Sequence, residues 1–142
     1  MATLELVQLS SLEKVFLNRP IEAKEFCRAS ALQGEEFAYQ IAYRSDCKMD
    51  LSLSVDSSIA DDIQIYEIGT APSQLPAYPD SMDENYITRE PGLFPDILNP
   101  LNPLEIKSVS ANRAIWINVT PSPSVKAGVY PITIVKSVAQ RS

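Results

Sequence analysis

The sequence of 142 residues contains no histidine. Without an imidazole, the chain cannot build a Ser-His-Asp triad, a histidine-containing zinc site or a histidine general base. It has only two cysteines, Cys27 and Cys47, too few for the dense disulfide framework of a small secreted fold. We therefore expect two reduced thiols, one or both of them partly buried.

Long apolar runs and clusters of positive charge are also missing. No apolar stretch approaches the roughly 20 residues that span a bilayer, and the N-terminus lacks the basic and apolar segments of a signal peptide. The 12 Lys and Arg residues are scattered among 18 Asp and Glu, which gives a net charge of −6 and no stripe that could neutralise phosphates. We expect a soluble cytoplasmic protein that binds neither nucleic acid nor membrane.

The sequence is rich in strand patterns. Apolar residues alternate with period two in several runs, most clearly over 35–44, and no window carries a sustained helical stripe. Seven or eight short strands in a chain of this length predict one domain, 1–142, with an all-β fold: a two-sheet antiparallel β-sandwich, immunoglobulin-like or related. The other strands are expected at 3–9, 25–31, 49–55, 62–68, 105–109, 113–120 and 129–136. Ser10 and Glu13 have capping-box spacing, which predicts one helical turn over 11–16.

The alternation also predicts the core between the two sheets. If the isoleucines of 113–120 face inward, Trp116 faces outward and needs a cover from the 71–104 segment or from another domain. The residues expected to be buried are Phe37, Tyr39, Ile41, Leu51, Leu53, Ile63, Ile65, Ile115, Ile117, Ile132 and Ile134.

Seven of the eleven prolines fall within residues 71–104. Proline removes a ladder donor and restricts the residue before it, so this stretch is predicted to be a long loop rather than a central strand or a helix. Its large apolar residues favour an ordered loop that packs against something. These residues are Leu75, Tyr78, Tyr86, Leu93, Phe94, Ile97, Leu98, Leu101 and Leu104.

Three adjacent acidic pairs are candidates for catalysis: Glu35–Glu36, Asp61–Asp62 and Asp83–Glu84. A glycosidase needs two carboxyl groups about 5–9.5 Å apart across a sugar. The first two pairs lie where strands begin, and neighbouring strand residues point to opposite faces, so we interpret them as charged starts of strands. The third pair lies in the proline-rich segment, where solvated carboxylates are the simpler interpretation. We therefore predict no catalytic residue.

Metal binding and glycosylation have weaker signals. Asp80, Asp83, Glu84 and Asn85 offer oxygen ligands for calcium, but they lack the periodic spacing of a calcium loop. We predict no metal and no cofactor. Asn118-Val-Thr120 matches a glycosylation acceptor, but without a signal peptide we interpret Asn118 as an ordinary strand residue.

Five segments, taken in order, resemble the N-terminal domain of glycoside hydrolase family 123-like proteins. They are Ala29-Ser-Ala-Leu-Gln-Gly-Glu-Glu-Phe-Ala-Tyr-Gln, Leu75-Pro-Ala-Tyr-Pro, Pro91-Gly-Leu-Phe-Pro-Asp-Ile-Leu, Arg113-Ala-Ile-Trp and Ala127-Gly-Val-Tyr-Pro-Ile-Thr-Ile. The resemblance covers nearly the whole chain, and its proline-rich third segment adds most to its specificity.

The resemblance implies a bacterial β-sandwich that precedes a barrel-like catalytic domain. Characterised members of that family release N-acetylgalactosamine from glycans, with an adjacent Asp-Glu pair of the barrel and the substrate's own acetamido group taking part. The implied role of this chain is a non-catalytic accessory domain, cut off after Ser142. Its implied partner is the C-terminal catalytic domain of the same polypeptide.

Two alternatives remain open. The chain is a carbohydrate-binding module with a glycan partner if exposed aromatics, such as Trp116 beside Tyr66 or Tyr86, form a stacking platform. It is a protein-interaction domain if the 71–104 segment contacts another protein. The candidate docking or ligand surface common to these hypotheses consists of Tyr78, Tyr86, Leu93, Phe94 and Trp116.

Overall fold

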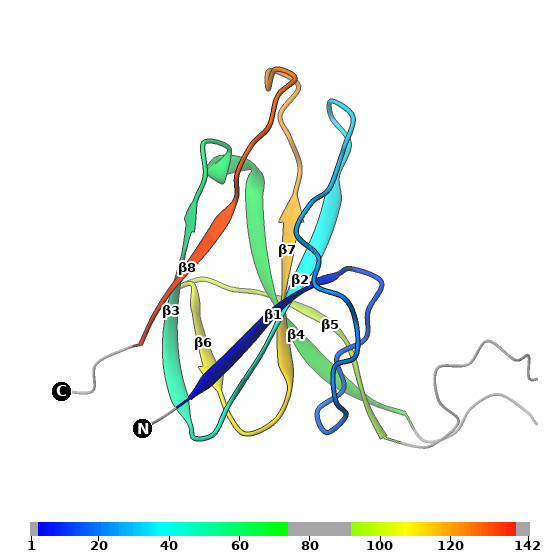
Figure 1. Ribbon diagram of the computed structural model, residues 1–142, viewed down its shortest axis with the longest axis vertical. Coiled ribbons are helices and arrows are strands. Elements are labelled where there is room, and N and C mark those ends of the chain that lie inside the picture. Colours follow the sequence, from blue (N-terminus) through cyan, green and yellow to red (C-terminus); the bar gives the residue numbers. More distant parts are fainter. Residues whose placement is uncertain (1–2, 74–91, 139–142) are drawn as a thin grey trace, which may run out of the picture.

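A computed structural model describes residues 3–73 and 92–138 (Figure 1). The strands found there are β1 (Leu4–Ser10), β2 (Phe37–Ser45), β3 (Met49–Asp56), β4 (Ile63–Ser73), β5 (Gly92–Pro100), β6 (Glu105–Ser108), β7 (Arg113–Val119) and β8 (Thr133–Val138). A single short 3-10 helix, η1 (Ala60–Asp62), leads into β4. Within the described ranges, no helix is both long and apolar enough to cross a membrane.

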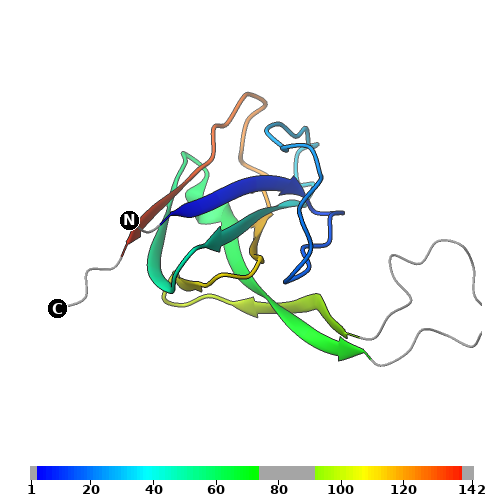
Figure 2. The ribbon, with the colours of Figure 1, turned by 60° about the horizontal axis from the view of Figure 1, so that its bottom comes forward.

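The strands form two sheets. One has the order β1-β2-β7-β4-β5 and the other the order β6-β3-β8, and all neighbouring strands are antiparallel. Figures 1 and 2 show the two sheets facing each other, with β7 in the middle of the larger one. The predicted all-β fold with two antiparallel sheets is therefore confirmed.

The inner core lies between the sheets, as the alternation predicts. In β7, Ile115, Ile117 and Val119 are buried and point inward, because alternate residues of a strand share one face. Of the predicted core residues, six are buried, namely Tyr39, Leu51, Ile63, Ile65, Ile115 and Ile117. The other five are partly buried and pack against them, namely Phe37, Ile41, Leu53, Ile132 and Ile134.

The proline-rich segment differs from its prediction. The predicted loop over 71–104 is wrong for residues 71–73, which belong to β4, and for residues 92–100, which form β5 and pair with β4. β5 tolerates Pro95 and Pro100 because it is an edge strand, where a missing ladder donor can face away from the sheet. Residues 74–91 are not described, and Tyr78, Tyr86, Asp83–Glu84 and the calcium candidates all lie within them.

Two further elements were predicted wrongly. Residues 25–31 form no strand, and Phe26 N donates a lone hydrogen bond to Gln8 O over 2.8 Å. Residues 11–16 form no helix beyond a tight turn, because the carbonyl oxygens of Ser10 and Glu13 accept hydrogen bonds from the Gln40 side chain. Cys27 and Cys47 are both free, and both are exposed, so their expected burial is also wrong.

Candidate docking and ligand-binding surface

The outer face of the five-stranded sheet carries a second apolar cluster. Its strand residues are Leu9, Ala42, Ile68 and Ala114, and all four are buried, although they point away from the inner core. The cover is Val15, with Ile21 and Ala23 packed beside it. We call residues 11–26 the strap; it follows β1 directly and appears in blue beside β2 and β5 (Figures 1 and 2). The chain itself therefore covers this part of the outer face.

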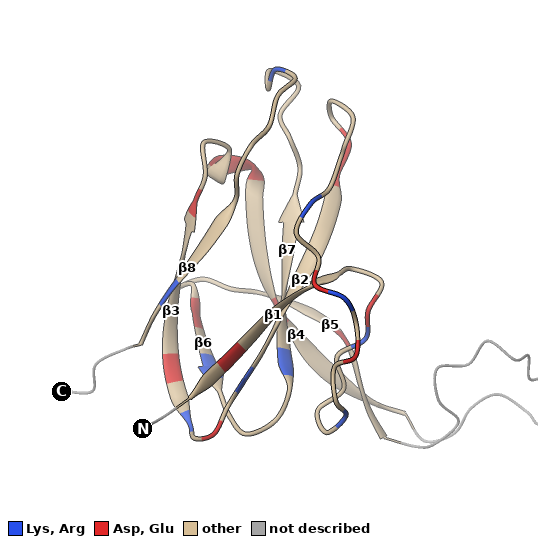
Figure 3. Ribbon diagram, viewed as in Figure 1, with Lys and Arg blue, Asp and Glu red and all other residues tan. Residues whose placement is uncertain are grey.

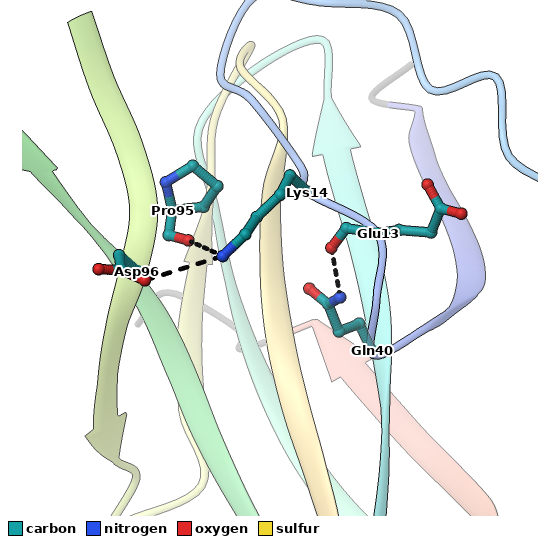
Figure 4. Close-up of polar contacts among 5 residues, drawn as sticks. All are labelled: Glu13, Lys14, Gln40, Pro95 and Asp96. Atoms are coloured by element: carbon teal, nitrogen blue, oxygen red, sulfur yellow. Dashed lines mark hydrogen bonds and ion pairs between the residues drawn. The ribbon is translucent and has the colours of Figure 1, made fainter. Parts of the chain in front are cut away.

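Two buried carboxamides hold the strap on the sheet. Gln40, which is 3% exposed, donates from Nε2 to Ser10 O over 3.0 Å and to Glu13 O over 2.7 Å (Figure 4). Asn112, which is 6% exposed, donates from Nδ2 to Phe16 O and Arg19 O over 3.2 and 2.5 Å. A buried amide without hydrogen-bond partners would destabilise the fold by about 1–3 kcal/mol. The strap must therefore keep its carbonyl oxygens beside these two amides, which fixes its path.

The strap also contacts β5. Lys14 Nζ lies 3.4 Å from Pro95 O and 3.7 Å from Asp96 Oδ1 (Figure 4). The rings of Phe16 and Phe94 meet edge to face, with their centroids 5.8 Å apart. Phe94, predicted to be a docking residue, therefore packs within the chain. Its neighbour Leu93 is 48% exposed.

Beyond the strap, two aromatic and two amide side chains form what we call the outer platform. Trp116 of β7 is the cross-strand partner of Tyr66 of β4, and Asn118 is the partner of Gln64. All four point outward, since Ile63, Ile65, Ile115 and Ile117 between them belong to the inner core. Trp116 packs by one side on the outer cluster and remains partly exposed.

Hydrogen bonds orient the polar members of the platform. Tyr66 OH donates to Gln64 Oε1 over 2.7 Å, so the phenol ring leans along β4 toward the amide. Asn118 Nδ2 donates to Glu36 Oε1 over 2.6 Å. Both carboxamides are thus held in defined positions.

A groove adjoins the platform at the edge of β4 where the pairing with β5 ends. β5 pairs with β4 from Tyr66 onward, and beyond that pairing Leu101 N donates one further hydrogen bond to Ile65 O over 3.2 Å. The groove has a volume of about 350 Å³ and lies between this edge, the chain after β5 and Val55 of β3. Its lining residues are Val55, Ile63, Gln64, Ile65, Tyr66, Pro100, Leu101 and Leu104.

The structure does not gather the predicted surface into one patch. Trp116 lies beside Tyr66, whereas Phe94 pairs with Ala71, five residues further along β4 and hence about 16 Å away along the strand. Tyr66 is the neighbour that the sugar-binding alternative named. The amides of Gln40, Gln64 and Asn112 were missed; the only signal for Gln40 is a polar residue between two outward alanines, Ala38 and Ala42.

The described acidic pairs serve the fold. Glu35 Oε2 accepts from Leu32 N, and Glu36 Oε1 accepts from Asn118. Asp62 Oδ2 accepts from Ser122 N beside η1. Charges of both signs are interspersed over the described strands and loops (Figure 3). The carboxylates of Glu35, Glu36 and Asp62 therefore hold turns and strand ends.

One ionisable cluster lies at an end of the inner core. Burial, and to a smaller extent the nearby Glu67 carboxylate, raise the pKa of the Tyr43 hydroxyl to about 12, while Arg113 opposes the change. Arg113 Nη2 donates to Glu67 Oε1 over 2.7 Å. Among the described residues, the Tyr43 hydroxyl has no hydrogen-bond partner. A phenol that stays protonated so far above neutral pH is suited to packing and not to acid–base catalysis.

The described residues thus form a two-sheet β-sandwich whose outer face is partly covered by the strap. No family profile and no curated protein matches the sequence. Among solved structures, the fold matches a family 123 glycoside hydrolase from Clostridium perfringens, studied for the hydrolysis of glycolipid glycans. The TM-score is 0.72 at 16% sequence identity, and the match covers 96% of this chain but 25% of that one. The chain spans about a quarter of that hydrolase, and the resemblance inferred from the sequence is confirmed at the level of the fold.

Proposed function

We propose that this chain is the non-catalytic N-terminal accessory domain of a family 123-like glycoside hydrolase, and that β5 docks it onto the catalytic domain of the same polypeptide. The match to a quarter of a longer hydrolase supports a domain of a larger protein. The roles of Glu35, Glu36 and Asp62 in local hydrogen bonds support the absence of catalysis in this part of the chain.

The observation that carries the docking role is the exposed apolar edge of the larger sheet. Leu93 is 48% exposed, and Ile97 and Leu98 are each 44% exposed, all on β5. Natural edge strands are normally protected by charge, proline or a cover. Here Pro95 and Pro100 hinder strand addition, yet the large side chains remain in solvent. A partner would therefore pack against these side chains rather than extend the sheet.

The test compares the 142-residue chain with the longer polypeptide that the proposal predicts, in which the reading frame continues into a catalytic domain. Oxidative footprinting measures the accessibility of individual side chains. Leu93, Ile97 and Leu98 should be protected in the longer form and labelled in the shorter one. Leu12 and Val129, which are 89% and 91% exposed, serve as controls and should be labelled in both.

A double substitution, Ile97→Lys with Leu98→Lys, should abolish the protection because docking would bury two unpaired charges. Equal labelling of β5 in both forms would refute docking through this strand. Hydrolysis of an aryl N-acetylgalactosaminide by the 142-residue chain alone would refute the non-catalytic role.

A further inference from the structure

We propose that the outer platform binds a neutral pyranose sugar of a glycan, with Trp116 and Tyr66 stacking on the ring and Gln64 and Asn118 contacting its hydroxyl groups. This role is separate from docking through β5, and neither proposal depends on the other.

The aromatic pair provides the stacking surface. Directly opposed residues of antiparallel strands have Cβ atoms about 4.5–5.5 Å apart, so Trp116 and Tyr66 lie side by side on the outer face. The strap buries the neighbouring outward residues Gln40 and Ala42 but leaves Trp116 partly exposed. The C–H face of a pyranose is apolar and slightly positive, and it suits the electron-rich face of an indole or phenol ring.

The adjacent amides provide hydrogen bonds of the right kind. Asn118 and Gln64 lie two residues along their strands from Trp116 and Tyr66, on the same face. A carboxamide both donates and accepts, and so does a sugar hydroxyl. The bonds from Tyr66 OH to Gln64 and from Asn118 to Glu36 hold these amides before a ligand arrives, which lowers the entropy lost on binding.

The groove extends the same site beyond Tyr66. Its volume of about 350 Å³ lies at the lower end of the range of roughly 300–1,000 Å³ for small-molecule sites. Gln64, Tyr66 and Pro100 belong to its lining, so a ligand stacked on the platform can continue into the groove beside the start of β4. An oligosaccharide therefore fits the surface better than a single sugar ring.

The charge of the surface selects a neutral glycan. No Lys or Arg belongs to the platform or to the lining of the groove, and Glu36 is the acidic side chain hydrogen-bonded to the platform. The chain as a whole has a net charge of −6. An acidic sugar would meet no cation among these described residues and would be repelled.

Trp116 is the only tryptophan in the chain, so its fluorescence reports directly on the platform. The full chain would be titrated into the millimolar range with three neutral probes: lactose, cellobiose and N,N′-diacetylchitobiose. We expect a saturable change in emission with at least one probe and none with sialic acid. Tyr66→Ala and Gln64→Ala should each weaken binding by about tenfold, the effect of losing one stacking or hydrogen-bonding partner.

Tyr130→Ala is the matched control. Tyr130 is also partly exposed, but its hydroxyl bonds to Lys126 O within its own loop, so the variant should bind like the original chain. Gln64 is exposed, and its substitution should leave the fold intact, so Gln64→Ala decides the question even if Tyr66→Ala is unstable. Ile97→Lys, which tests docking, should leave sugar binding unchanged.

The proposal is overturned if none of the three probes gives a saturable change. It is equally overturned if folded Gln64→Ala binds with unchanged affinity, since the ligand would then lie elsewhere.

Discussion

The inner core and the outer cluster under the strap are held together by different interactions. Between the sheets, large side chains such as Tyr39, Leu51 and Ile117 pack against one another and fill the space. On the outer face, Ala42 and Ala114 fill little, and the strap is held there by the amides of Gln40 and Asn112. We infer that the inner core sets the global stability, whereas the outer cluster sets whether one segment stays in place.

The largest expected effect comes from removing volume in the inner core. Ile117→Ala and Leu51→Ala, both at almost fully buried positions, should each lower the free energy of unfolding by about 2–5 kcal/mol. Chemical denaturation measures the loss. Val135→Ala, at an exposed position on β8, is the control and should cost less than about 1 kcal/mol. Similar midpoints for all three variants would show that the assigned inner face is wrong.

Gln40→Ala should have a smaller and local effect. The variant removes the hydrogen bonds to Ser10 O and Glu13 O and should lower the free energy of unfolding by about 1–3 kcal/mol. Amide hydrogen exchange should speed up in residues 11–26 while β7 stays protected. Gln33→Ala is the control: it also loses two hydrogen bonds to backbone oxygens, but at an exposed site, so hydrogen exchange should change little. If exchange in β7 accelerated as much as in the strap, the two regions would form one cooperative unit.

Alkaline pH should weaken the inner core before the strap. The folded-state pKa of Tyr43 is about 12, above its ordinary value of 10.0, because burial opposes ionisation. Its contribution to stability is therefore complete below pH 10 and is lost as the pH rises toward 12. Denaturation midpoints measured across this range should fall more steeply for the original chain than for Tyr43→Phe. The same pH dependence of the midpoint in both proteins would show that the Tyr43 hydroxyl is exposed to water and not buried.

The smallest effect is expected for the ion pair between the strap and β5. Lys14 and Asp96 are both exposed and their charged atoms are 3.7 Å apart, so Lys14→Met should cost no more than about 1 kcal/mol. Hydrogen exchange in the strap should hardly change. A loss as large as that of Gln40→Ala would mean that charge, and not the buried amides, holds the strap.

The same contrast explains what could be predicted from the sequence. Period-two alternation identifies the inner core because large apolar residues such as Ile115 and Ile117 recur on one face. On β2 and β7 the outer cluster presents only the small side chains of Ala42 and Ala114, and the strap that covers them has no periodicity, so neither could be predicted. β5 was missed because its prolines argue against a central strand, and nothing local indicates that it lies at an edge. The pairing of Trp116 with Tyr66 depends on register, which the sequence does not fix.

The strap has a consequence for the order in which the chain folds. The strap precedes β2, β4 and β7 in the sequence, yet these strands supply its binding surface, and Asn112 lies 96 residues after Phe16. It can close only once strands far apart in the sequence have paired, which is the slow step in folds of this kind. We expect pulse-labelled hydrogen exchange during refolding to protect β2 and β7 first and residues 11–26 last. Early protection of the strap would instead make it part of the folding nucleus.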